Sequence, residues 1–541
     1  MKRLFLLLFN LYLISSFAQN TQFANIYDVQ YGNEHGGQLL IVPDGYIVAN
    51  IGVCQDIEDG VGCSPIIKID KSGNLVTYKI FVKHLWRSPY SAIHNVNDTV
   101  YICGTDDDTA PAPYKWRVYK CNNNLDSLGG FEKSYFGDKS LVLKGMEIKG
   151  DYIYMVGKEL LELNATDINF WIVKTDKQGN LIKKRQLDTV AWFEKDNYDV
   201  SIAQTADDNF VIAYSSLQDT SSWYYSEGRR HKLMKFDDDL DTLWYHDFGL
   251  NTDYFHPIVE IVEGTRDSGL IYTSLISLID LYEHGEISKD VLNLFGEIQK
   301  VIFKLDSNGD VVWSDTMWAK RYTPGTGSGS PVYNITDAHE MRNGDIVIAG
   351  QYEDYKKKIY YGLIRRYSAD GKLKWEKIYE DENIEGEIAY FYKFQEEENG
   401  DLVCAGSIRF DHTVPDESFE WVVRLDSTGC FEPDCGVSDS LQVIHVKSGF
   451  ITKTKEVISD YTYSEGMILY PNPCKDYIKV KVLKEFHAVS SSIFDIQGRL
   501  LVKTSGDKIE EPDISKLNSG IYFLKLTDKY GRSTIGKFIK Q

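Results

Sequence analysis

The chain has 541 residues, of which 80 are acidic and 59 basic, and its formal net charge at pH 7 is −21. A chain of this length is too long to form one ordinary globular core, unless it folds as a repeat architecture. The excess of acidic residues argues against nucleic acid or an anionic membrane surface as a partner, because both require clustered Lys and Arg.

Residues 1–18 have the pattern of an export signal that is removed after translocation. Lys2 and Arg3 precede an apolar run over residues 4–13, and a small residue, Ala18, supplies a cleavage site. The apolar run is shorter than the roughly 20 residues that a membrane-spanning helix needs. We therefore expect the general export machinery to act on the chain, cleavage after Ala18, and a mature chain without a transmembrane segment.

One phrase occurs seven times in the body of the chain: an apolar strand that ends in Lys or Arg, then a polar turn and a second strand. The residues that open these turns, about 50 to 70 positions apart, are Asp70, Asn122, Asp176, Asp237, Asp306, Ser368 and Asp426. Two further strands precede each copy, so one unit holds four short strands. This period predicts a seven-bladed β-propeller over residues 19–436, because chained β-sandwiches would not repeat a four-strand phrase in this way.

The repeated turns have a clear physical logic. An Asp or Asn side chain accepts hydrogen bonds from backbone amides two residues on, and a glycine such as Gly309 adopts a positive φ. Trp244, Trp313 and Trp375 lie a few residues into the following strand. This pattern resembles the tryptophan-docking repeats of quinoprotein-like propellers, which implies that each indole packs on the next blade. Most copies lack the Trp, so we expect the packing role alone and no cofactor.

The ends of the repeat region suggest how the ring closes. The seventh unit has its third strand near residues 421–426, but the GCFEPDCG segment that follows is poor strand material. Residues 23–30, FANIYDVQ, precede the first unit and are predicted to supply the missing outer strand. The alternative is that they form a disordered leader.

All eight cysteines lie beyond the export signal, in a compartment where disulfides persist. The candidate disulfides that would close local loops are Cys54–Cys63 and Cys430–Cys435. Cys103 and Cys121 fall on neighbouring predicted strands and are a further candidate pair. No Cys-x-x-Cys pair occurs in the sequence, so no metal site is predicted.

The chain carries no catalytic signature, since it has no Gly-x-Ser-x-Gly elbow, His-Glu-x-x-His helix or phosphate-binding loop. His339 with Glu340 is only half of a zinc motif. The loops that enter the innermost strands are rich in aromatic residues, which suit stacking on sugars or gripping a peptide. The ligand-binding candidates are Trp86, Tyr90, Trp192, Tyr198, Tyr254, His256, Trp318 and Tyr322. The alternative is that these rings pack between blades.

After a polar linker over residues 437–466, with one strand near 441–446, four motifs follow in order: LYPNPCKDYIKVKV, FDIQGRLL, DISKLNSGIYFLKL and KFIK. Their alternation of apolar and polar residues predicts half-buried antiparallel strands in a small β-sandwich. Together the motifs resemble the C-terminal sorting domain of the type IX (Por) secretion system of Gram-negative bacteria, over residues 467–541. The resemblance rests on Pro471, Asn472, Pro473, Gly498, Gly520 and Lys537.

The resemblance implies an Ig-like domain that the type IX machinery recognises, with a cargo that is secreted or attached to the outer cell surface. Two functions for that cargo remain open from the sequence. The first is a non-enzymatic module that binds a glycan or a protein at one mouth of the propeller. The second is a polysaccharide hydrolase or lyase that uses acidic residues of the same region as acid and base. The first is favoured because no catalytic constellation is visible.

Overall fold

The computed structural model divides the chain into two units, Met1–Thr452 and Lys453–Gln541. In the first unit it describes residues 22–28, 35–53, 62–63, 65–80, 92–106, 115–136, 140–160, 167–191, 200–217, 229–248, 261–277, 298–317, 333–354, 357, 359–382, 388–409, 418–432, 435–436 and 441–452. In the second unit it describes residues 462–464, 467–470, 474, 478–482, 488–495, 499–505, 512, 514–529 and 533–540.

Most described strands of the first unit fall into seven antiparallel groups of four, ordered from the innermost strand outwards. The first group contains β2 (His35–Val42), β3 (Gly45–Val53), β5 (Pro65–Asp70) and β6 (Leu75–Ile80), with β4 (Gly62–Cys63) beside β3. The second contains β7 (Ala92–Val96), β8 (Thr99–Asp106), β9 (Lys115–Asn122) and β10 (Ser127–Lys133). The third contains β11 (Ser140–Lys149), β12 (Tyr152–Leu160), β13 (Asp167–Asp176) and β14 (Leu181–Ala191).

The next two groups are β15 (Val200–Gln204), β16 (Phe210–Leu217), β17 (Arg229–Phe236) and β18 (Thr242–Phe248); and β19 (Ile261–Gly264), β20 (Leu270–Ser277), β21 (Ile298–Leu305) and β22 (Val311–Met317). The last two are β23 (Tyr333–Glu340), β24 (Ile346–Asp354), β25 (Ile359–Tyr367) and β26 (Leu373–Asp381); and β27 (Ile388–Glu396), β28 (Leu402–Arg409), β29 (Ser418–Leu425) and β1 (Phe23–Asp28).

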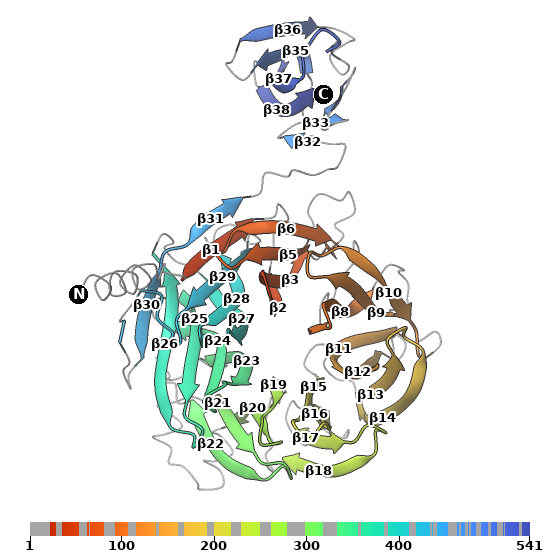
Figure 1. Ribbon diagram of the computed structural model, residues 1–541, viewed down its shortest axis with the longest axis vertical. Coiled ribbons are helices and arrows are strands. Elements are labelled where there is room, and N and C mark those ends of the chain that lie inside the picture. Colours follow the sequence, from red (N-terminus) through yellow and green to blue (C-terminus); the bar gives the residue numbers. More distant parts are fainter. Residues whose placement is uncertain are drawn as a thin grey trace, which may run out of the picture. The chain divides into compact units, whose positions relative to one another are not determined.

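These groups stand radially around a common centre in chain order (Figure 1). Their innermost strands contact one another in the sequence β2, β7, β11, β15, β19, β23 and β27, and β27 contacts β2 again. Apolar side chains fill the spaces between neighbouring groups, as where the rings of Tyr154 and Phe210 lie 4.1 Å apart. The all-β propeller fold predicted from the repeats is therefore confirmed.

Strand β1 closes the ring by completing the last group. It pairs antiparallel with β29, with Phe23 opposite Arg424 and Tyr27 opposite Glu420. The prediction that residues 23–30 supply the missing outer strand is confirmed for residues 23–28. The two ends of the propeller are thus held in one sheet.

The interval expected to be a linker contains two strands, β30 (Gln442–Val446) and β31 (Gly449–Thr452), which we call the strap. They pair in parallel with β26 and β1 at the outer edges of the last two groups. Ile444 and Val446 are buried in the same apolar cluster as Trp421, which explains why the strap adheres to the propeller. The sheets thus extend beyond residue 436, the end expected from the repeats.

The turn that opens with Asp306 shows how the repeated phrase folds. Its carboxylate oxygen Oδ1 accepts hydrogen bonds from the backbone N–H groups of Asn308, at 2.8 Å, and Asp310, at 3.0 Å. Gly309 has a φ of 87°, a conformation that side chains resist. The same side-chain bonds recur at Asp70, Asn122, Asp176, Asp237 and Asp426.

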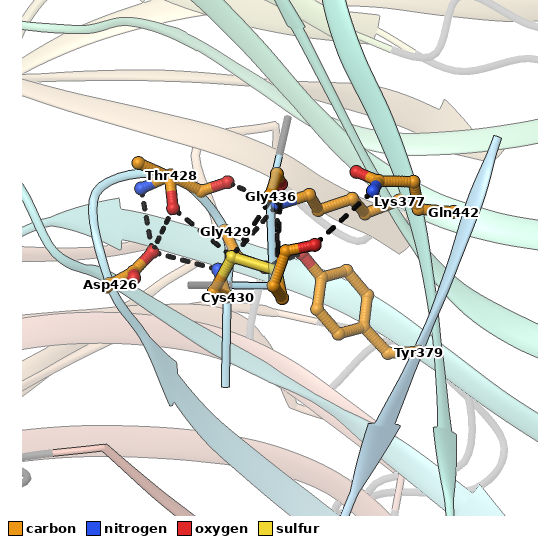
Figure 2. The surroundings of a disulfide bond; sticks show 9 residues. Lys377, Tyr379, Asp426, Thr428, Gly429, Cys430, Gly436 and Gln442 are labelled. Atoms are coloured by element: carbon orange, nitrogen blue, oxygen red, sulfur yellow. Dashed lines mark hydrogen bonds between the residues drawn. A yellow bond between two sulfur atoms is a disulfide. The ribbon is translucent and has the colours of Figure 1, made fainter. Parts of the chain in front are cut away.

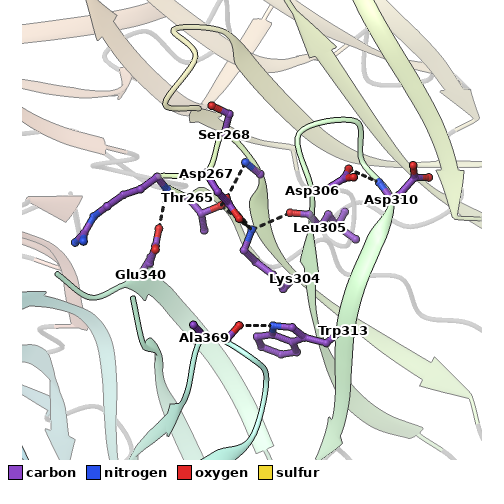
Figure 3. A network of polar contacts seen from close by, with 12 residues as sticks. Thr265, Asp267, Ser268, Lys304, Leu305, Asp306, Asp310, Trp313, Glu340 and Ala369 are labelled. Atoms are coloured by element: carbon purple, nitrogen blue, oxygen red, sulfur yellow. Dashed lines mark hydrogen bonds and ion pairs between the residues drawn. The ribbon is translucent and has the colours of Figure 1, made fainter. Parts of the chain in front are cut away.

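Aromatic side chains of the outer strands dock on the turn of the next group. The indole of Trp313 packs against Gly371 and donates a hydrogen bond to the carbonyl oxygen of Ala369, at 3.1 Å (Figure 3). The indole N–H of Trp244 donates likewise to the carbonyl oxygen of Ser307, at 2.8 Å. The packing role expected for these two tryptophans is confirmed.

Across the ring closure, the hydroxyl of Tyr27 donates a hydrogen bond to the carbonyl oxygen of Gly73, at 2.6 Å. Tyr27 belongs to the last group and Gly73 to the first, so the closing contact repeats the contact made between other neighbours. The ring of Phe23 also lies over Gly73, where a Cβ atom would be 2.5 Å from it. Gly73 therefore allows the positive φ of the turn and also leaves room for the Phe23 ring.

The basic residue near the end of the third strand is buried in most groups. Lys304 is 7% exposed, and its ammonium binds the carboxylate of Asp267 at 2.8 Å and the hydroxyl oxygen of Thr265 at 3.0 Å (Figure 3). Lys235 binds Asp207 in the same way at 2.8 Å. These pairs explain why the repeated phrase ends its strand in Lys or Arg, since each buried charge has a partner.

The second unit is a small β-sandwich. One sheet contains β32 (Thr462–Ser464), β33 (Met467–Tyr470) and β34 (Lys479–Val482), and the other has the order β36 (Leu500–Ser505), β35 (Ala488–Asp495), β37 (Gly520–Asp528), β38 (Ser533–Lys540). Val480 of the first sheet and Ile493, Leu524 and Phe538 of the second share one apolar core. The fold expected for this region is thus present.

Replacing Gly371 with Ala should lower the stability of the propeller by more than the same change at Gly344. Both glycines have nearly the same φ, 83° and 84°, so the backbone cost of about 1 kcal/mol is shared. A Cβ at Gly371 would lie 2.6 Å from the Trp313 indole, whereas at Gly344 the nearest atom is 3.9 Å away. Denaturant titration of both variants measures the difference, expected to be roughly 1 to 2 kcal/mol; equal losses would refute the docking role.

Candidate functional site

The loop residues chosen from the sequence as ligand-binding candidates lie outside the described residues: Trp86, Tyr90, Trp192, Tyr198, Tyr254, His256, Trp318 and Tyr322. The described strands instead bring a different set of side chains together. They are half-buried or buried ionisable groups on the innermost strands, which surround the centre of the ring. We call this set the axial cluster, and it comprises His94, Glu147, Glu263, Asp337, His339 and Lys393.

The ring of His339 on β23 bridges two carboxylates. Its Nδ1 lies 3.0 Å from Oε1 of Glu263 on β19, and its Nε2 lies 3.0 Å from Oδ2 of Asp337. The ammonium of Lys393 on β27 binds Oδ1 of Asp337 at 2.7 Å, and the backbone N–H of Phe394 donates to Oδ2 at 3.0 Å. Three neighbouring blades therefore meet in one charged network.

Burial and pairing oppose one another in setting the pKa values of this network. Burial would raise the pKa of Asp337, but the charges of His339 and Lys393 hold it well below its ordinary value. Burial would lower the pKa of His339, but Asp337 and Glu263 raise it to about 10. His339 is therefore an imidazolium at neutral pH and donates both of its N–H groups to carboxylates.

Glu147 on β11 is the opposite case. Burial raises the pKa of this carboxyl group to about 8, and the negative charge of Glu263 adds to the shift. Glu147 is therefore protonated at neutral pH. Burial also lowers the pKa of His94 on β7, whose Nε2 lies 2.6 Å from the carbonyl oxygen of Met146. The neutral His94 ring thus carries its proton on Nε2, which leaves Nδ1 as an acceptor.

Several members of the axial cluster are open to solvent despite their central position. The side chains of Glu263, Lys393 and His339 are 36%, 30% and 27% exposed, whereas that of Asp337 is 1% exposed. Water and small solutes thus reach the first three, while the buried Asp337 holds His339 and Lys393 by hydrogen bonds. Fixed donors and acceptors stand side by side with balanced charge, and a protonated carboxyl group stands near a second carboxylate. Such an array is suited to binding polar groups or to acid–base chemistry.

Of this set only His339 stood out in the sequence, as half of a zinc motif. The available signal was an ionisable residue inside the weak strand that begins a repeat, as in AIHNV, GMEIK, IVEG and TDAHE. Among the described residues, no group of three or more His, Cys, Asp or Glu side chains is arranged to hold a metal ion.

The described cysteines include one disulfide, between Cys430 and Cys435, with a Cα–Cα distance of 5.6 Å. Cys54 and the side chain of Cys63 lie outside the described residues. The third expected pair, Cys103 with Cys121, is wrong, because these thiols are not joined. The strand register places Cys103 opposite Val118, three positions from Cys121, so the two side chains enter different apolar clusters on opposite faces of the sheet.

Two residues of the predicted sorting motif are described: Gly520 begins β37, and Lys537 pairs with Phe523 across β37 and β38. Cys474, from the first motif, forms a parallel bridge to Lys540. Its backbone N–H donates to the carbonyl oxygen of Ile539 at 2.8 Å. The first motif is therefore held against the last strand. The other motif residues, Pro471, Asn472, Pro473 and Gly498, lie outside the described residues.

Comparison with protein families identifies this C-terminal unit. Residues 468–541 match the family described as "Secretion system C-terminal sorting domain". The chain is therefore a propeller protein that carries a type IX sorting domain, which marks proteins secreted or attached to the outer surface by that system. No helix among the described residues has the length and apolar character needed to cross a membrane.

Solved structures similar to the chain include propeller-containing proteins. The Pyrococcus furiosus Trilobed protease β-propeller domain, described as having an open velcro topology, is 9% identical, with a TM-score of 0.38 over 72% of this chain and 94% of that one. The Pyrococcus horikoshii acylaminoacyl peptidase is 10% identical, with a TM-score of 0.39 over 72% of this chain and 51% of that one.

Puromycin hydrolase is 11% identical, with a TM-score of 0.41 over 74% of this chain and 52% of that one. The chain therefore spans about half the length of the two enzymes. At these scores the similarities carry no functional argument. A comparison with curated proteins gives no match.

The stability of the Glu147→Gln variant should diverge from that of the wild type as pH rises. The pKa of Glu147 is raised from 4.5 to about 8 in the folded state, so its stabilising contribution is complete below pH 4.5 and is lost as pH rises to 8. We expect similar stabilities at pH 4.5 and a variant more stable than the wild type by roughly 1 to 3 kcal/mol at pH 8.5. Thermal melts across this range test it, with exposed Glu398→Gln as the control; a constant difference would contradict the raised pKa.

Phe538→Asp should prevent delivery to the cell exterior, because Phe538 is fully buried in the sorting domain and stacks on Tyr522 at 5.6 Å. An unpaired charge there costs more than about 3 kcal/mol. Ile535→Asp on the same strand is the matched control, because Ile535 is 53% exposed. Fractionation of cells should find the first variant retained and the second delivered. Wild-type delivery of Phe538→Asp would show that recognition does not need the folded domain.

Proposed function

We propose that the chain is an exported, non-enzymatic binding module for a glycan or a protein, and that the axial cluster contributes to its ligand site. The observation that carries this proposal is the network around His339, in which Glu263, Lys393 and the imidazole are fixed by hydrogen bonds yet remain open to solvent. Fixed polar groups lose little conformational entropy on binding. The network therefore has the character of a preformed polar site.

The chemistry of the cluster favours a glycan. Within the His339 network the two carboxylates of Glu263 and Asp337 balance the imidazolium and the ammonium of Lys393, so no strong net charge selects an ion. A sugar hydroxyl both donates and accepts, and it suits sites where a carboxylate stands beside an N–H donor. The aromatic loop residues chosen from the sequence, such as Trp86 and Trp318, would add stacking surfaces.

A second candidate function is a polysaccharide hydrolase or lyase. It is favoured by one observation, that Glu147 is protonated at neutral pH while the Glu263 carboxylate lies close enough to contribute to raising its pKa to about 8. Two carboxyl groups whose environments separate their protonation states are the usual acid and base of glycoside hydrolysis. In such an enzyme Glu147 would be the general acid, and Glu263 the base or the nucleophile.

A glycan and peptide array with the purified mature protein tests the proposal. We expect glycan binding that Glu263→Gln weakens at least about tenfold, since a charged hydrogen bond contributes roughly 1.5 to 3 kcal/mol. The control, Glu398→Gln, changes an exposed side chain and should bind as the wild type does. Absence of binding on both arrays, or equal binding by all three proteins, would refute the axial site.

The same glycans, incubated with the protein and assayed for new reducing ends or unsaturated products, separate the two functions. A binding module leaves them intact. Turnover that falls at least about 100-fold in Glu147→Gln would establish the second candidate instead.

A further inference from the structure

The surroundings of the Cys430–Cys435 disulfide include a buried lysine. Lys377 on β26 is fully buried, and its ammonium lies 3.2 Å from the sulfur atoms of both Cys430 and Cys435 (Figure 2). It also donates to the carbonyl oxygens of Thr428, at 2.7 Å, and Gly436, at 3.1 Å. These two bonds use two of its three protons, so one N–H remains for the sulfurs.

This arrangement is of little value to an intact disulfide. A disulfide sulfur is a weak acceptor, and burial lowers the pKa of Lys377 to about 8. An ammonium beside a thiolate, in contrast, forms a charge-assisted hydrogen bond and lowers the pKa of the thiol. The position of Lys377 therefore stabilises the reduced site far more than the oxidised one.

The hydroxyl of Thr428 does not take part in this effect. It lies 3.3 Å from the Cys430 sulfur but 2.7 Å from a carboxylate oxygen of Asp426. Since a hydroxyl has one proton, it donates to the nearer and charged acceptor. Lys377 is thus the donor to the sulfur atoms.

The two sulfurs differ in access. Cys430 is 1% exposed, whereas Cys435 is half-buried and borders exposed Gly436. An incoming thiol therefore reaches Cys435, and Cys430 is the leaving group. The strap begins beside this site, because Lys377 pairs with Gln442 in the strand register and the Gln442 side chain lies 3.5 Å from the Cys435 carbonyl oxygen.

We propose that Cys430–Cys435 is an exchange-active disulfide, with Lys377 as the positioning residue that stabilises the departing Cys430 thiolate. A thiolate of a small dithiol attacks the Cys435 sulfur, a mixed disulfide forms there, and the electron pair of the broken S–S bond stays on Cys430. The second thiol of the reagent then displaces Cys435 and leaves as a cyclic disulfide. The reagent is oxidised by two electrons, the protein disulfide is reduced, and the short loop between Cys430 and Cys435 loses its covalent closure.

The test is the reduction rate of the mature protein by dithiothreitol, with new thiols alkylated and the peptide that contains both cysteines quantified by mass spectrometry. We expect Lys377→Met to react about tenfold more slowly than the wild type, because the leaving thiolate loses its ammonium. Lys372→Met, which removes the same charge from a side chain that is 82% exposed, should react within about twofold of the wild type. Equal or faster reduction of Lys377→Met would overturn the proposal.

A measurement on the wild type alone covers the case in which Lys377→Met does not fold. The charged group that acts on Lys377 is Asp426, and Tyr379, whose hydroxyl donates to Gly429 nearby, has a pKa raised well above its ordinary value and stays neutral. Among Asp426, Tyr379 and Lys377, only Lys377 loses its proton between about pH 7 and 9. The rate constant per reagent thiolate should therefore fall at least about fivefold over this range, and a constant value would also overturn the proposal.

Discussion

The propeller depends on the contact between the outer strand of one blade and the turn of the next. A four-stranded group cannot cover both of its apolar faces alone, so each group needs two neighbours. The contact orients the two blades as well as burying apolar surface between them. In it, an aromatic ring lies over a glycine and the polar atom of the ring bonds a carbonyl of the same turn, as Trp244 and Trp313 do. Phe23 and Tyr27 share this contact across the closure, the first through its ring and the second through its hydrogen bond, and the ring is complete without a special seam.

The ring in turn creates the axial cluster. Innermost strands from separate blades converge, so residues far apart in the chain, such as Glu147 and Lys393, affect one another's ionisation. The charge of Asp337, which is 1% exposed, would not be stable alone. The network tolerates it because His339 and Lys393 offset Asp337, while Glu147 avoids the cost by retaining its proton. A polar centre is thus maintained inside an otherwise apolar assembly.

The features that could be predicted from the sequence are those set by residues close together in the chain. The turns, the propeller and the closing strand follow from short patterns, such as Asp306 with Gly309, that act within a few residues. The axial cluster was missed because Glu263 is unremarkable in its own strand, His339 indicated only half of a zinc motif, and the two meet only through ring geometry. The Cys103–Cys121 pairing failed because periodicity locates neighbouring strands but not their register. The second strand of the strap was missed because its pairing with β1 joins segments more than 400 residues apart.

The position of β1 has a consequence for the order of events during biogenesis. Phe23 emerges from the ribosome early, but its partner Arg424 is made only after almost the whole propeller. Strand β1 therefore waits for β29, and the circle cannot be completed until the last blade has been made. A polypeptide with this layout keeps an open ring throughout its synthesis, and the circle is completed only once segments from both of its ends are present.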